Sequence, residues 1–420
     1  MTVEAQAAPA TPATGGRFAA ATDALHVRDF RLLWLNSLTF FLGRSMQMVA
    51  VSWLVLDITD SAALVGAALF AQGLPLALFS LPAGVWADRL DRRRLLVVSQ
   101  TVSVVMTAVL TFLLLIDAVM VWQIFVIAFV MGTAMALGQP SRQALVPSLV
   151  GPERLMNAIV LNNLVQNLSF VIGPALAGLL LAQIGFGGTF VVQVGLLVAG
   201  LPWLLAMRVP PIAHQTERAP LMTELREGVS HVLASPLVRS LFIVTAFTGI
   251  FYVGTYQALS PVFARDILDV GALGLGFMNA AFGTGMFLGS IFIASRRNLN
   301  RKGEVLLVSL LTGALVFGVF AASRWFALSE LALLAWGFGA AFFMNLTITL
   351  IQANTPDRVM GRVMSVQALC FYGVSPIGNL LGGVLAEVVS APFAVVVSSV
   401  AVGVLAIWYL LRQPELRAAS

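Results

Sequence analysis

The sequence predicts an all-α membrane protein with twelve transmembrane helices in two six-helix bundles. Its composition is the first observation: 59% of the 420 residues are hydrophobic and 10% are charged, against roughly 25% charged residues in soluble domains. The second is the length of the apolar runs, because a helix needs about 20 apolar residues to cross a bilayer. The third is that short basic clusters separate these runs, as loops do in polytopic proteins.

Apolar runs of this length form helices or close into a barrel, because lipid offers no partner for backbone amides. Barrel strands would alternate apolar and polar residues over about ten positions, and the sequence lacks that alternation. The twelve helices are expected at residues 30–57, 62–83, 95–116, 119–139, 158–184, 189–208, 238–262, 273–294, 304–322, 328–352, 364–388 and 392–411.

The basic residues predict which side of the membrane each loop occupies. With the N-terminus inside, the termini and even-numbered loops hold every Lys and Arg, Arg142 included, except Arg44, Arg265 and Arg324. Inner loops of membrane proteins carry the positive excess, so both termini are expected in the cytoplasm. The net charge of +5 therefore reflects topology and does not indicate a nucleic-acid partner.

Polar segments mark the domain boundaries. We expect a disordered cytoplasmic tail over 1–27, bundles over 28–208 and 238–411, a cytoplasmic linker over 209–237, and a second cytoplasmic tail over 412–420. Within the linker, apolar and polar residues recur on opposite faces at helical spacing. This pattern fits an amphipathic helix on the inner membrane surface, and an ordinary connector fits it equally. The apolar set is Leu221, Leu225, Val229 and Val232, and the polar set is Glu224, Glu227 and His231.

The loop after the second span reads GVWADRLDRRRLL, from Gly84 to Leu96. It resembles the signature loop of the major facilitator superfamily, which implies the major facilitator fold. The resemblance also implies a conformational latch, in which a glycine lets two helices approach closely and charged residues hold one state closed. Asp91 stands where the family usually has a second glycine. A basic topogenic loop would explain the arginines but not the spacing of Gly and Asp. The latch residues are Gly84, Asp88, Arg89, Arg92 and Arg93.

The fifth span contains VIGPALAGLL, in which Gly173, Pro174 and Gly178 resemble the GPxxGG element of drug antiporters in this superfamily. Proline bends a helix and glycine permits close packing, so this antiporter-like bend is expected to seal and pivot the bundle. Pro and Gly are also common in membrane helices without such a role. SPIGNLLGG in the eleventh span is the counterpart, and PERLM at 152–156 answers PDRVM at 356–360, which indicates an internal duplication.

Longer stretches resemble the branch of enterobactin exporters and macrolide efflux proteins: RDFRLLWLNSL, WLVLDITDSAALVG, LREGVSHVLASPLVRS and PDRVMGRVMSV. The resemblance covers roughly residues 28–408. It implies a secondary transporter of the multidrug-resistance type, working by alternating access in the bacterial cytoplasmic (inner) membrane. Its expected substrate is a small amphipathic compound such as a drug or siderophore. We expect a monomer.

Arg44 lies near the middle of the first expected span, where a charge costs about 2.5–3.5 kcal/mol on insertion scales. Ser37, Arg44 and Gln47 share one helical face, which is expected to point into a central cavity. We interpret Arg44 as attracting an anionic or carbonyl-rich part of the substrate, with a structural ion pair as the alternative. Relatives in this branch often carry Asp at the position after Gly43.

Amides and aromatic residues recur along the other expected spans, interleaved with Phe251, Phe282 and Phe342. An amide-and-aromatic cavity suits a bulky, mostly apolar solute held by few hydrogen bonds. For any one of these residues, interhelical hydrogen bonding is the alternative. With Arg44 and Gln47, the substrate cavity is expected to include Gln72, Gln139, Asn163, Gln166, Asn167, Tyr252, Tyr256, Gln257, Asn279, Asn345, Gln367 and Tyr372.

Energy coupling is expected to come from an ion gradient. The sequence has no nucleotide-binding loop of the G-x-x-x-x-G-K-[ST] type. Asp57, Glu330 and Glu387 lie near outer ends of spans and are the candidate proton sites, with ordinary solvated helix ends as the alternative. Proton antiport is implied by the resemblance alone, because the fourth expected span lacks the arginine that many drug antiporters carry.

Other classes of function fit less well. An enzyme needs a reactive constellation, whereas His26, His214 and His231 fall in polar segments and no His, Cys or carboxylate cluster has metal-ligand spacing. The sequence therefore predicts no enzyme, metal or cofactor. Cys370 is the single cysteine and is interpreted as a core thiol. A lysophospholipid or other lipid translocator of the same fold is the alternative transport function, and a non-transporting receptor of this fold remains open.

Overall fold

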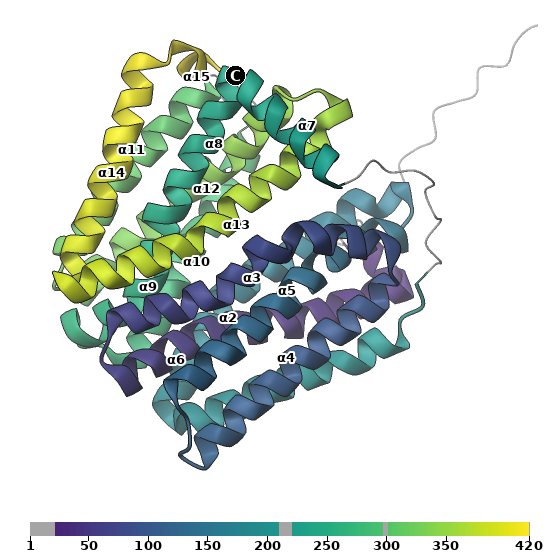
Figure 1. Cartoon of the computed structure of the whole chain (residues 1–420), viewed down its shortest axis with the longest axis vertical. Helices are drawn as coiled ribbons and strands as arrows, with labels where there is room; N and C mark the ends of the chain where they lie inside the picture. The colour runs from purple at the N-terminus through teal and green to yellow at the C-terminus, as the bar shows by residue number, and fades with distance from the viewer. Residues whose placement is uncertain (1–21, 210–220, 297–300, 420) are drawn as a thin grey trace, which may run out of the picture.

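The computed structural model describes residues 22–209, 221–296 and 301–419, without the side chains of residues 80–89, 221–225 and 372. These residues form helices joined by short loops, and no strand occurs among them. Eleven of the helical segments are long and apolar enough to cross a membrane. The prediction of an all-α membrane fold is confirmed (Figure 1).

The first half of the chain consists of α2 (Arg28–Thr59), α3 (Ala62–Arg89), α4 (Arg92–Leu115), α5 (Val121–Leu149) and α6 (Pro152–Ala206). Helix α6 has 55 residues, about twice the length of its neighbours, and is interrupted at Gly185, whose φ is 68° and ψ −172°. Such a backbone is open to glycine because it has no Cβ. The break falls between the expected spans at 158–184 and 189–208, so α6 supplies both.

The second half begins with α8 (Pro236–Thr248), η2 (Gly249–Gly254), α9 (Thr255–Val262) and η3 (Phe263–Ile267), which follow one another as a single 32-residue segment. Two stretches of it, η2 and η3, have π-helical hydrogen bonding, which in membrane helices often accompanies proline. The remaining spans are α10 (Gly271–Ser295), α11 (Lys302–Ala322), α12 (Phe326–Ala353), α13 (Asp357–Val388) and α14 (Ala391–Arg412).

Helix α7 (Leu221–Ala234) lies between the two halves and is amphipathic in sequence, as expected for the linker. It docks against α13: Glu227 forms an ion pair with Arg362, and Gly228 faces the backbone carbonyl of Arg362. Glycine permits this approach because a Cβ would lie 3.1 Å from that oxygen. The part of the linker at 210–220 lies outside the described residues.

The chain ends are more ordered than expected. The tail was expected to be disordered through residue 27, but Asp23–His26 form a 3-10 helix, η1. The Asp23 carboxylate pairs with Arg154 at 2.8 Å, and the Ala24 amide donates to the Asn157 side chain at 2.9 Å. At the other end, α15 (Pro414–Ala418) follows α14, and Leu416 is fully buried.

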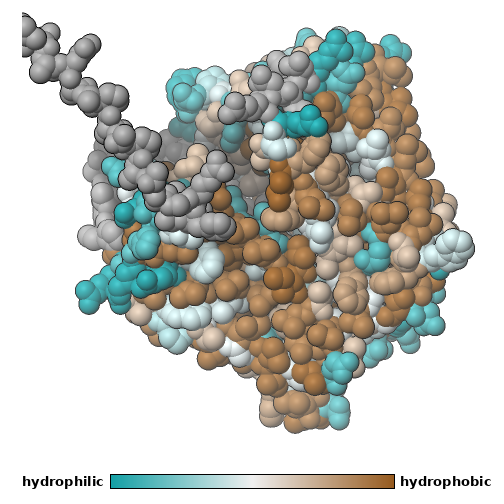
Figure 2. Space-filling model, turned by 180° about the vertical axis from the view of Figure 1, so that it is seen from behind, coloured by the Kyte–Doolittle hydropathy of each residue, from teal (hydrophilic) through white to brown (hydrophobic). Residues whose placement is uncertain are grey.

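Much of the protein surface is apolar. Figure 2 shows a broad hydrophobic face, with hydrophilic residues gathered toward its edges. Large apolar side chains stay exposed on this protein, such as Phe112, Leu315 and Val404 at 61%, 66% and 61%. An exposed apolar area of this extent is unfavourable in water and suits contact with lipid tails.

The two halves meet along two helix pairs, α3 with α13 and α6 with α10, and each crossing contains glycines. A Cβ on Gly66 would lie 2.3 Å from the carbonyl oxygen of Asn379, and one on Gly178 would lie 2.5 Å from that of Ala272. Helices approach this closely only where a side chain is missing. Gly276 faces Gly178 from the partner helix, with 3.0 Å between the built Cβ and its Cα.

Polar ties join the halves at one end of the molecule. Arg265 donates to the Leu56 carbonyl at 2.9 Å and pairs with Asp60 at 2.8 Å. Glu387 accepts from the Ser61 hydroxyl at 3.1 Å and the Ala63 amide at 3.3 Å. We call this the far end, and the opposite end, where α7 and the chain termini lie, the linker end. Among the described side chains, hydrogen bonds and ion pairs between α2–α6 and α8–α14 occur only at the far end, and the ribbons diverge toward the linker end (Figure 1).

Candidate functional site

The Arg44 face of α2 is half-buried to buried. Arg44 itself is half-buried, and Gln47 is 5% exposed with its side-chain amide donating to the Met131 sulfur at 2.7 Å. Gln47 is thus held against α5. Ser37, on the same face, is fully buried and is used in a contact that the sequence did not predict.

That contact is with Arg142, which the sequence analysis placed in a loop. Helix α5 continues past its expected end at 139, through Pro140 and Pro147, and carries Arg142 inside it at 3% exposure. The Arg142 guanidinium donates to Asn36 Oδ1 at 2.8 Å and Ser37 Oγ at 2.7 Å. The expectation that the fourth span lacks an arginine was therefore wrong. The error arose because proline was taken as the helix end, whereas membrane helices tolerate it.

Aromatic rings and amides complete the surroundings of Arg142. Its guanidinium carbon lies 4.6 Å from the centre of the Phe40 ring, a cation–π distance. Asn36 also donates to Gln100 at 2.8 Å and to the Gly200 carbonyl at 2.9 Å. This network joins α2, α4, α5 and α6. Among the described side chains no carboxylate pairs with Arg142, so its charge is balanced by dipoles and rings.

A small cavity of about 10 Å³ adjoins Arg142 and is the size of a single water. Gln139, one of the expected cavity residues, lines it with Gln100 and Phe40. This is the first place where the structure brings an expected cavity residue next to a buried charge. It lies in the half of α5 nearer the linker end.

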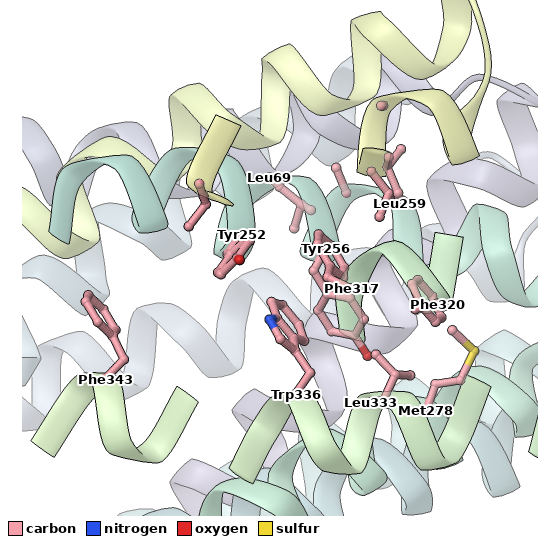
Figure 3. Packing of buried hydrophobic residues seen from close by; sticks show 14 of the residues in the cluster. Leu69, Tyr252, Tyr256, Leu259, Met278, Phe317, Phe320, Leu333, Trp336 and Phe343 are labelled. Carbon is pink, nitrogen blue, oxygen red and sulfur yellow. The ribbon is translucent and has the colours of Figure 1, made fainter. Parts of the chain in front are cut away.

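Two further expected cavity residues, Tyr252 and Tyr256, belong instead to an aromatic cluster inside the second half (Figure 3). Tyr252 donates its hydroxyl to the Leu310 carbonyl at 3.1 Å, and both rings contact Trp336, with centres 5.5 and 5.2 Å away. The Tyr256 hydroxyl is buried and has no hydrogen-bond partner among the described residues. Interhelical packing, the alternative to substrate contact, accounts for Tyr252.

The other expected cavity residues are dispersed. Asn279 donates to the Leu275 carbonyl on its own helix and Asn345 to that of Ala341. Asn163 and Asn167 are exposed on α6, as is Asn345 on α12. Half-buried positions are Gln72, Gln166, Gln257 and Gln367. The side chain of Tyr372 lies outside the described residues.

Gln367 lines a second, larger cavity of about 70 Å³ in the linker-end half of α8, α12 and α13. The sequence analysis did not identify the other residues around it, because no motif or charge marks them. They come together only through helix packing. They are Thr245, Phe343, Met344, Thr347, Ile348 and Phe371.

The latch segment is described only in part, since the side chains of Gly84, Asp88 and Arg89 lie outside the described residues. Arg92 donates to the Ala144 carbonyl at 3.2 Å, and Arg93 donates to the Leu204 carbonyl at 2.9 Å. Asp91 caps α4 by accepting from the amides of Arg93 and Arg94. Its φ of −59° needs no glycine, which explains why Asp can stand at this position.

The expected helix bend lies at interfaces. Gly173 packs on Ser45 of α2, with 1.9 Å between a built Cβ and the Ser45 hydroxyl, while Gly178 faces α10. In the counterpart on α13, Pro376 lies against Gly73 of α3, and Gly383 faces the Ala62 carbonyl at 2.5 Å from a built Cβ. Both elements therefore sit where the halves meet, at positions related by the internal duplication.

The three candidate proton sites differ in environment. Asp57 is exposed, and Glu387 is exposed and engaged in the far-end ties. Glu330 is half-buried, and its Oε1 atom is buried without a hydrogen-bond partner among the described residues. Among these three, Glu330 has the surroundings that a proton-carrying carboxyl group would need.

Comparison with known proteins gives the family. The profile of the transmembrane secretion effector family, a major facilitator group, matches residues 19–420. The chain belongs to this family. Transmembrane secretion effectors similar to this one include the enterobactin exporter EntS of Shigella boydii serotype 4, 26% identical over 389 residues, or 92% of each chain. Macrolide efflux protein A of Streptococcus pyogenes is 21% identical over 367 residues, covering 85% of this chain and 89% of that protein.

Solved structures show the same fold. The nucleoside transporter NupG matches with a TM-score of 0.73 at 14% identity, over 91% of this chain and 98% of that one. A bacterial homologue of the human lysosomal transporter Spinster, inward-facing and unoccupied, matches with a TM-score of 0.70 at 18% identity, over 94% and 97%. The predicted branch is confirmed. The chain is a multi-span membrane transporter and not an enzyme.

Proposed function

We propose that this transporter exports a small amphipathic compound, of the drug or siderophore type, across the bacterial cytoplasmic membrane by proton-coupled antiport. The observation that carries the proposal is the asymmetric closure of the two halves. Arg265 and Glu387 tie them together at the far end, whereas ties of this kind among the described side chains are confined to that end. Two halves joined at one end only are what alternating access requires of a resting state.

We further propose that the linker end faces the cytoplasm, as the distribution of basic residues predicts. The structure then corresponds to the inward-facing state, which an exporter uses to take up its substrate. Arg44, Gln139 and Arg142 supply polar groups in the first half, and the second half supplies aromatic and apolar ones. The similar enterobactin exporter and macrolide efflux protein support an amphipathic substrate.

Glu330 is the residue we assign to proton coupling. An ionised carboxylate with a buried, unpartnered oxygen is costly, so a neutral carboxyl group fits these surroundings better. The group lies near the far end of α12, one turn after the helix begins at Phe326. Its proton would therefore exchange with the outside when the far end opens.

Transport into proteoliposomes tests the proposal. A panel of a macrolide, enterobactin and a lysophospholipid is offered with and without a pH gradient, and a protonophore collapses the gradient. We expect gradient-driven uptake of the macrolide or enterobactin. Uptake that ignores the gradient contradicts proton coupling, and uptake of the lysophospholipid alone replaces the drug or siderophore assignment with lipid translocation.

Glu330→Gln separates coupling from binding. This variant should keep substrate exchange between the two sides at equal pH but lose at least tenfold of the gradient-driven uptake. Glu153→Gln, at an exposed position at the start of α6, serves as the control and should keep both activities. Unchanged gradient-driven uptake in Glu330→Gln would rule out its role in coupling.

A further inference from the structure

The 70 Å³ cavity of the second half has a lining unlike that of the small cavity beside Arg142. Phe343, Met344, Ile348 and Phe371 make most of its wall apolar, and its polar contributors are two threonines and Gln367. All of these side chains are uncharged. The space is several times what a single water requires, so a group of roughly six heavy atoms could enter with small side-chain adjustments.

Thr347 is the feature of this cavity that packing alone does not explain. It is 2% exposed, and its hydroxyl has no hydrogen-bond partner among the described residues. Threonines on the neighbouring turns and helices donate to the carbonyl four residues earlier, as Thr245 does to Leu241 and Thr248 to Val244. An unpartnered buried hydroxyl destabilises a protein, whereas a ligand in the cavity would satisfy it.

The position of the cavity suits uptake from the linker end. Thr245 lies nine residues after the start of α8 at Pro236, and Thr347 lies six residues before the end of α12 at Ala353. At 1.5 Å per residue these are depths of about 14 and 9 Å from the helix ends. Gln367 is at a similar depth in α13, ten residues after Asp357.

We propose that this cavity is a subsite for a neutral, apolar part of the substrate, a ring or branched alkyl group that carries one hydrogen-bonding oxygen or nitrogen. Thr347 and Gln367 bind that polar atom, and the four apolar side chains enclose the rest. The inference rests on the proposed function and makes it more specific. The substrate is held with its neutral end in the second half and its polar end toward the first.

Thiol labelling tests the subsite without requiring transport. Cys370→Ser removes the native thiol, and Thr347→Cys places a new one in the cavity. Two methanethiosulfonates of the same shape, neutral 3,3-dimethylbutyl and cationic trimethylammonioethyl, are compared by intact mass spectrometry. Rates are divided by those with free cysteine and compared with Thr349→Cys, which is exposed on the same helix. We expect at least a tenfold preference for the neutral reagent at residue 347 beyond that at 349.

The expected consequence of filling the cavity is loss of transport. Modification of Thr347→Cys by the dimethylbutyl group should reduce export of the compound found active in proteoliposomes at least fivefold, whereas modification at residue 349 should not. Equal preference at the two positions, or full export with the cavity filled, overturns the subsite. If no compound in the panel is transported, the proposed function fails while the labelling result stands.

Replacing the hydroxyl gives a second, independent readout. Thr347→Val should raise the melting temperature, because an unsatisfied buried group is removed, and should weaken export of the active compound severalfold. Thr248→Val is the matched control, since Thr248 is equally buried at 2% but its hydroxyl is satisfied on its own helix. A Thr347→Val protein that is stabilised and exports normally would show that the hydroxyl contacts no substrate.

Discussion

Removal of Arg265 should shift the protein toward a state that is open at the far end. Its guanidinium crosses from η3 to the end of α2, where it meets the Leu56 carbonyl and the Asp60 carboxylate. Asp60 has an 84% exposed side chain, so this ion pair contributes at most about 1 kcal/mol. The hydrogen bond to Leu56, from a guanidinium only 26% exposed, adds about 1 kcal/mol.

The two terms together give about 1–2 kcal/mol for Arg265→Gln, since pairing with the adjacent Asp266 is kept in either state. This corresponds to roughly a 5–30-fold change in the ratio of the two states. Spin labels at Met120 and Trp325, both exposed in far-end loops on different halves, report the distance by double electron–electron resonance in a Cys370→Ser background.

Arg324→Gln is the matched control for this measurement. Arg324 is also a far-end arginine, but it donates to the Ala321 and Ser323 carbonyls of its own half. We expect a longer-distance population to grow in Arg265→Gln and not in Arg324→Gln. Identical distance distributions in both variants would refute the assignment of Arg265 as a tie between the halves.

Two more substitutions probe the interior. Arg142→Ala should destabilise the protein by about 1–3 kcal/mol, because Asn36 and Ser37 lose their donor, while Arg154→Ala, which breaks a half-exposed pair with Asp23, should cost less than about 1 kcal/mol; thermal unfolding in detergent compares them, and equal losses would contradict the buried network. Gly178→Val should block the approach of α6 to α10 and reduce export at least tenfold, whereas Gly318→Val, where a Cβ meets no atom within 4 Å, should not; normal export by Gly178→Val would exclude a need for this close contact.

The sequence predicted the membrane fold well because each span is specified locally. A run of about 20 apolar residues must be helical in lipid whatever surrounds it, and even the break at Gly185 falls between two expected spans. The helix ends were less predictable. Helix α5 continues through Pro140, since neighbouring helices compensate for the missing amide, and so Arg142 is buried rather than solvated.

The contacts between distant residues could not be predicted from one sequence. Arg265 meets Asp60 across 205 residues of chain, and nothing near either residue indicates its partner. The same holds for Thr347, whose interest lies in a missing hydrogen bond and in a cavity shared by three helices. Tyr252 shows the converse, because a residue type that suits a binding cavity is used here for packing.

Reciprocal motion of the two ends tests the central claim most directly. Spin labels at Gln143 and Gln352, exposed near the linker ends of α5 and α12, report that end, and the pair at Met120 and Trp325 reports the other. The account predicts that any condition which lengthens the far-end distance, Arg265→Gln included, shortens the linker-end distance in the same proportion of molecules. Ends that open together, or a linker-end distance that stays fixed while the far end opens, would contradict it.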